Sequence, residues 1–87
     1  MEYILISFKS RSETLKFAEL LKKSGVYATV VTTPKEAGIG CGLSVKTENV
    51  NLGFIKRAIY YSGSKSFAAV FLVKVQGLKR QIKPLYM

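Results

Sequence analysis

The chain has 87 residues, of which 48% are hydrophobic and 22% are charged, and its formal net charge is +9 at pH 7. This length allows one domain, and this composition excludes a disordered chain. A single cysteine excludes an internal disulfide, and the absence of histidine excludes Ser-His-Asp and Cys-His catalysis and a structural zinc site.

The first part of the chain predicts a strand, a helix and a second strand. Residues 2–8 alternate and are rich in aromatic and aliphatic side chains, which is typical of a strand. Ser10 and Glu13 have the spacing of a capping box, so we expect a helix to begin there. Gly25 is placed to end this helix, and the β-branched residues 26–32 predict the second strand.

A loop and a short strand follow. Pro34 ends the second strand because proline has no N–H to donate to a ladder. We expect residues 35–40 to form a loop or one short helical turn. Residues 42–46 alternate in polarity and predict a third, short strand.

The last predicted elements are a helix, a strand and a tail. Asn49 or Asn51 can cap the second helix, and Gly63 is placed to end it. Residues 66–75 are strongly apolar and predict the final strand. The segment 77–87 is a basic C-terminal tail whose structure the residue pattern leaves open.

The predicted order β-α-β-β-α-β favours one ferredoxin-like domain over residues 1–76. This α+β fold is a split βαβ sandwich, an antiparallel sheet with both helices on one face. The final strand is apolar on both sides, with one side formed by Phe67, Ala69, Phe71, Val73 and Val75. We therefore expect the second sheet face to be covered, either by the tail or by a second copy in a homodimer.

The sequence carries no signal for a membrane or for export. Residues 1–8 lack a basic leader, and the longest apolar stretch, residues 67–73, is far shorter than a bilayer-spanning helix. A lone cysteine is typical of a reducing compartment. We expect a cytoplasmic protein without a membrane partner.

The excess of basic residues favours an anionic partner such as nucleic acid. RNA-recognition motifs share the predicted element order, but the third predicted strand lacks the aromatic residue on which bases stack. Phosphates could still be held by Lys46, Lys74, Lys79, Arg80 and Lys83. The alternative for these five residues is a solvated basic surface. The acidic residues are scattered and predict neither a carboxylate pair nor a metal site.

Cys41 is the candidate reactive residue. Gly40 and Gly42 flank it, leave the sulfur little side-chain cover, and could stabilise a thiolate through their backbone N–H groups. Lys35 could add to this effect. A thiolate here could accept a sulfur atom and pass it on by thiol exchange. The alternative is that Cys41 is a small buried hydrophobic residue.

The glycine-rich segment 38–42 superficially resembles a phosphate-binding loop. It lacks the Gly-Lys-Ser/Thr ending of such loops. A positive-φ turn that leads into the third strand explains these glycines better.

Two motifs resemble those of the selenium/sulfur carrier protein-like family, namely Thr33-Pro34-Lys35-Glu36 and Cys41-Gly42-Leu43. The resemblance covers residues 3 to about 75. It implies that Cys41 carries a persulfide or selenide and that Pro34 shapes the loop. It also implies a carrier or binding module without a cofactor, whose partner is a protein sulfur or selenium donor such as a cysteine desulfurase. A nucleic-acid-binding domain and a structural subunit recruited through the sheet face remain the alternatives.

Overall fold

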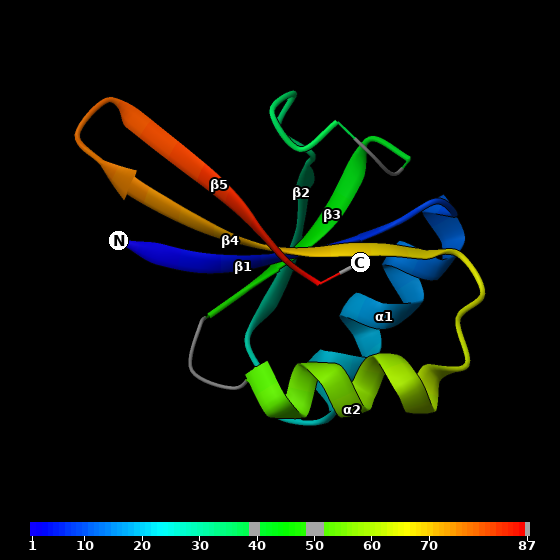
Figure 1. Ribbon diagram of the computed structural model, residues 1–87. Helices are drawn as coiled ribbons and strands as arrows, with labels where there is room; N and C mark the ends of the chain where they lie inside the picture. The colour runs from blue at the N-terminus through cyan, green and yellow to red at the C-terminus, as the bar shows by residue number, and fades with distance from the viewer. Residues whose placement is uncertain (39–40, 49–51, 87) are drawn as a thin grey trace.

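The computed structural model describes residues 1–38, 41–48 and 52–86. In chain order the elements are β1 (Glu2–Phe8), α1 (Arg11–Lys23), β2 (Ala28–Thr32), β3 (Leu43–Thr47), α2 (Leu52–Ser62), β4 (Phe67–Gln76) and β5 (Lys79–Tyr86). The strands form one antiparallel sheet in the order β2-β3-β1-β4-β5 (Figure 1). The first four strands have the arrangement of a ferredoxin-like split βαβ sheet, so the predicted α+β class is confirmed.

Helix α1 begins where the capping-box spacing predicts. Ser10 is the N-cap, and its Oγ accepts a hydrogen bond from the N–H of Glu13 at 3.2 Å. The Glu13 carboxylate turns to the connection between α2 and β4, where it accepts hydrogen bonds from the hydroxyls of Ser64 and Ser66. Ser66 Oγ in turn accepts the N–H of Ser10 at 3.3 Å. The first turn of α1 is thereby fixed to the start of β4.

We expect Ser10→Ala to lower the free energy of unfolding by about 1 kcal/mol, because the N–H of Glu13 loses its acceptor. Urea denaturation followed by circular dichroism measures this loss. Ser10→Thr keeps a hydroxyl at the cap and should lose only about a few tenths of a kcal/mol. Equal losses in the two variants would show that the cap bond does not stabilise the helix.

The helix ends and the central turn also follow the predicted signals. Gly25 and Gly63 have φ angles of 80° and 65° just beyond α1 and α2. Strand β2 begins two residues later than predicted because the N–H of Val26 donates to Leu21 O at the end of α1. A turn follows Pro34, whose carbonyl accepts a hydrogen bond from the third residue beyond it. The predicted caps of the second helix lie outside the described residues.

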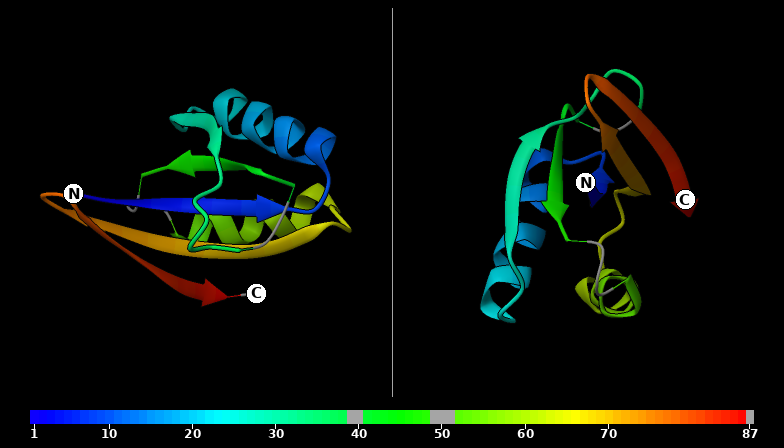
Figure 2. Two further views of the ribbon diagram at one scale, coloured as in Figure 1. Left: turned by 90° about the horizontal axis from the view of Figure 1, so that it is seen from above. Right: turned by 90° about the vertical axis from the view of Figure 1, so that its left-hand side faces the viewer.

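Both helices cover the same face of the sheet, where the main core lies (Figure 2). This core joins α1 and α2 to β1, β3 and β4 through Ile4, Ile6, Phe8, Phe17, Leu21, Val45, Ile55 and Val70. Phe67 also packs here, so its predicted place beside Phe71 is wrong. The pairing of β1 with β4 shifts register between Ser7 and Phe8, and this shift brings Phe67 opposite Phe8 on the helix side.

A second, smaller core lies on the other face of the sheet. Its members are at most 4% exposed and are Leu5, Ala69, Phe71 and Val73. Ile82 of β5 and Ala37 of the loop between β2 and β3 pack against it. Figure 1 shows the loop and β5 on the side of β1 and β4 opposite to the helices. The tail and this loop therefore cover apolar surface on this face of the sheet. From the sequence alone, either the tail or a second copy could have formed this cover.

An ion pair joins the two parts of this cover. Arg80 on β5 forms a bidentate pair with Glu36 of the loop, at 3.0 and 3.1 Å from its Nη2 to the two carboxylate oxygens. A hydrogen bond from the Glu36 backbone, followed by the hydrogen bonds and the charge of Arg80, holds the pKa of Glu36 below its usual value, although Glu36 is exposed. Within the described residues, no helix is both long and apolar enough to cross a bilayer.

Candidate functional site around Cys41

Cys41 lies at the junction between the β2–β3 loop and β3. Its N–H donates to Phe8 O at 3.0 Å, which joins the loop to the end of β1. The next residue, Gly42, has a φ of 93°, a conformation that L side chains rarely adopt. The carbonyl of Gly42 accepts the N–H of Thr33 at 2.8 Å and so closes the loop at its base. These bonds fix the backbone on both sides of the thiol.

The thiol contacts the first turn of α1. Cys41 Sγ lies 3.6 Å from the hydroxyl oxygen of Thr14 and 3.7 Å from Leu43 O. Thr14 is fully buried, and its single hydroxyl hydrogen can be donated either to Ser10 O, 2.9 Å away, or to a thiolate at Cys41. Cys41 itself is only partly buried. Its sulfur therefore contacts the first turn of α1, in a residue that remains partly exposed.

The surroundings lower the pKa of the Cys41 thiol. Burial alone raises this pKa, but hydrogen bonds from Thr14 and from the backbone of Leu43 and Cys41 outweigh it. The charge of Arg11, the first residue of α1, acts in the same direction. The positive end of the helix dipole also favours an anion at this position. The net pKa is below the ordinary value of a cysteine thiol, so the reactive thiolate is favoured.

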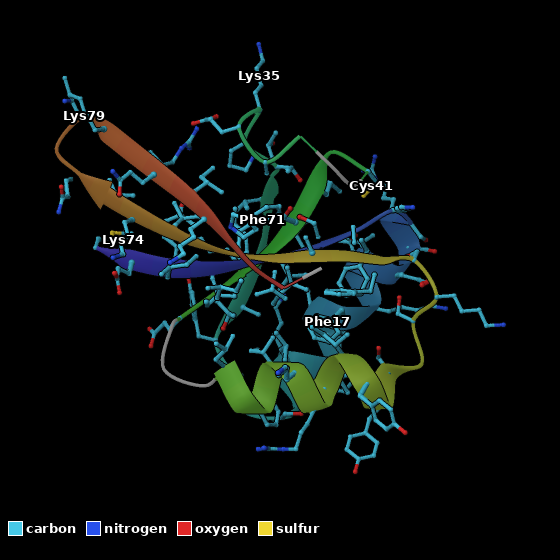
Figure 3. The ribbon with its side chains drawn as sticks, in the orientation of Figure 1. Phe17, Lys35, Cys41, Phe71, Lys74 and Lys79 are labelled. Carbon is cyan, nitrogen blue, oxygen red and sulfur yellow. The ribbon has the colours of Figure 1, made fainter. Side chains whose placement is uncertain are left out.

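The predicted neighbours of the thiol are only partly brought together. Gly42 is adjacent and supplies the open backbone, whereas Gly40 lies outside the described residues. Pro34 lies at the other end of the loop, where its carbonyl accepts the N–H of Ala37 at 3.0 Å. Lys35 extends into solvent away from Cys41 (Figure 3). The basic group that acts on the sulfur is Arg11.

A family model described as "Putative Se/S carrier protein-like" matches residues 3–66. The chain belongs to this family. The matched segment runs from β1 to the connection after α2 and includes Cys41, while β4 and β5 lie beyond it. Neither the curated proteins nor the solved structures contain a significant match to this chain.

Three of the five basic residues predicted to bind phosphate have partners within this carrier-like chain. Lys46 Nζ lies 4.4 Å from the ring centroid of Tyr3, and Lys74 Nζ lies 3.6 Å from a carboxylate oxygen of Glu2. Arg80 is held by the loop as described above.

The five basic residues also lie on both faces of the sheet. The register places Lys46 opposite Leu5 and Arg80 opposite Val75, on the face away from the helices. Lys74, Lys79 and Lys83 alternate with these positions and lie on the opposite face. The five residues are therefore divided between the two faces, with three of them on the helix side.

No metal centre arises from the described part of the chain. In residues 1–38, 41–48 and 52–86, no three side chains of His, Cys, Asp or Glu come together in a way that could hold an ion. The chemistry that the described site supports is that of the thiol.

Proposed function

We propose that this protein carries sulfur or selenium on Cys41 as a persulfide or its selenium analogue. The observation that carries the proposal is that the chain's single thiol is partly exposed, contacts the N-terminal turn of α1 and has a lowered pKa. Membership in the carrier-like family supports the same role. The loading partner is a protein sulfur or selenium donor, such as a cysteine desulfurase.

Loading is a transfer between two thiols. The Cys41 thiolate attacks the outer sulfur of a persulfide on the donor protein. A sulfur–sulfur bond forms at Cys41 as the one in the donor breaks, and the departing donor thiolate takes up a proton. The transferred atom keeps its oxidation state, so loading needs neither an oxidant nor a reductant.

Delivery runs the same exchange in the other direction. A nucleophile on the acceptor attacks the outer sulfur, and Cys41 leaves as a thiolate. A thiol of lower pKa is a better leaving group in such exchanges. The contact with Thr14 and the charge of Arg11 therefore assist delivery as well as loading.

The backbone beside the thiol leaves room for a partner. A Cβ built on Gly42 would meet no atom within 4 Å apart from its two chain neighbours, so the described residues leave this backbone open. Thr14 and Leu43 contact the sulfur from the protein side. The thiol is thus contacted from the protein side in a residue that is partly exposed, which fits a carrier.

Mass spectrometry of the intact protein tests this proposal. After incubation with a cysteine desulfurase and free cysteine, we expect the wild type to gain the mass of one sulfur atom and to lose it on reduction. Cys41→Ser should gain nothing, because the chain then holds no thiol. A wild type without the adduct, or an equal adduct on Cys41→Ser, would refute the proposed function.

A further inference from the structure

Three basic residues gather at the end of the sheet that holds Cys41. Lys9 follows β1, Arg11 opens α1 and Lys65 precedes β4. Two backbone hydrogen bonds bring these chain segments together. One runs from Cys41 N to Phe8 O at 3.0 Å, and the other from Lys9 N to Ser66 O at 2.7 Å. We call Lys9, Arg11 and Lys65 the cationic rim.

The charges of the cationic rim have no acidic partner in the described part of the chain. All three residues are exposed, whereas Lys22, Lys74 and Arg80 elsewhere pair with Glu19, Glu2 and Glu36. Among the described residues, the acidic residue near the rim is Glu13, whose charged carboxylate accepts hydrogen bonds from two serine side chains and forms no ion pair with a rim residue. With three cations and one carboxylate, this end of the sheet keeps a net positive charge near the thiol.

We propose that the cationic rim docks an acidic segment of the protein that exchanges sulfur with Cys41. This inference rests on the proposed carrier function, because it names the partner of the same site. A persulfide donor is a protein, so the favoured anion is a group of Asp and Glu side chains rather than a phosphate backbone. Docking there would place the partner's reactive sulfur next to Sγ of Cys41.

The physical basis is attraction between exposed charges over about 10 Å, the screening length at moderate ionic strength. Each such pair contributes little in water, but three cations acting on a multiply charged anion add up. Steering of this kind raises association rates and falls steeply with added salt. The rate at which Cys41 reacts with charged disulfides therefore reports on the rim without any knowledge of the partner.

The test compares three small disulfides on the same thiol: dithiobisnitrobenzoate, which is a dianion, dithiodipyridine, which is neutral, and cystamine, which is a dication. We expect wild-type Cys41 to favour the dianion. Combining Lys9→Gln, Arg11→Gln and Lys65→Gln should lower the anion-to-neutral rate ratio about fivefold at low salt. Using a ratio cancels any change in the reactivity of the thiol itself.

The matched control removes the same charge far from Cys41. Lys23, Lys79 and Lys83 are exposed, at the last turn of α1 and along β5, and their joint replacement by Gln should leave the ratio within about twofold. An unchanged ratio in the rim variant, or an equal fall in the control, would overturn the docking surface. This test involves no persulfide. It can therefore support the docking surface even if the protein fails to take up sulfur.

Protection of Cys41 distinguishes an acidic protein from a nucleic acid. A polyglutamate peptide and a single-stranded oligonucleotide are each added before dithiodipyridine, at matched concentrations of negative charge. We expect the peptide to slow modification of wild-type Cys41 at least as strongly as the oligonucleotide, and to have no effect on the rim variant. Stronger protection by the oligonucleotide would assign the surface to nucleic acid and overturn the proposal.

Discussion

Replacing Phe71 with alanine is expected to lower the free energy of unfolding by about 3–5 kcal/mol. Phe71 is 4% exposed in the second core, and Ile82 and Ala37 pack against this core. Deleting the ring leaves a cavity that the sheet, held by pairing on both sides of β4, cannot close. Such a loss is a large share of the stability of a domain of this size. Urea denaturation monitored by circular dichroism gives the value.

Two further variants make this result interpretable. Tyr61 is an aromatic residue that is 79% exposed, so Tyr61→Ala should change the free energy of unfolding by less than about 0.5 kcal/mol. Phe71→Leu keeps most of the volume and should remain folded with a loss below about 1.5 kcal/mol. If Phe71→Ala cost no more than Tyr61→Ala, β5 and the loop would not form a stabilising cover.

Local pattern predicted most of the fold because each element carries its own signal. The alternation in residues 2–8, the cap at Ser10 and the glycine at position 25 act over a few neighbours, so single-sequence reasoning finds them. The register shift beside Phe8 leaves no such signal, and it moved Phe67 to the other face of the sheet. Strand β5 was not predicted because its basic residues resemble those of a solvated tail.

The site was predictable only in the part that is local in sequence. Cys41 and Gly42 stand out as candidates because a lone thiol beside glycine is visible in the chain itself. Thr14 and Arg11 lie far away in sequence and meet the thiol only because β1, β3 and α1 share one end of the fold. The predicted topology already puts the first turn of the first helix at the end of the sheet that holds Cys41. Both residues could therefore have been inferred from that topology. Lys35, by contrast, is near in sequence and points away.

Replacing Thr14 with valine is expected to slow the reaction of Cys41 with iodoacetamide at neutral pH by about tenfold, the effect of losing one hydrogen bond to a charged group. Thr14 is fully buried and its hydroxyl lies 3.6 Å from Sγ. Valine keeps the shape but has no hydrogen bond for the thiolate, so the pKa of Cys41 rises. The rate of alkylation measured against pH reports this rise directly.

The sign of the pH dependence separates an electrostatic effect from a change in access. When the pKa of Cys41 rises, the alkylation rate decreases at pH values below the midpoint of the profile. The plateau at high pH, where the thiol is fully ionised, stays close to that of the wild type. A blocked thiol would instead lower the plateau itself. Thr14→Ser retains the hydroxyl and should keep the wild-type midpoint. A midpoint that is unchanged in Thr14→Val would show that α1 does not activate Cys41 through this contact.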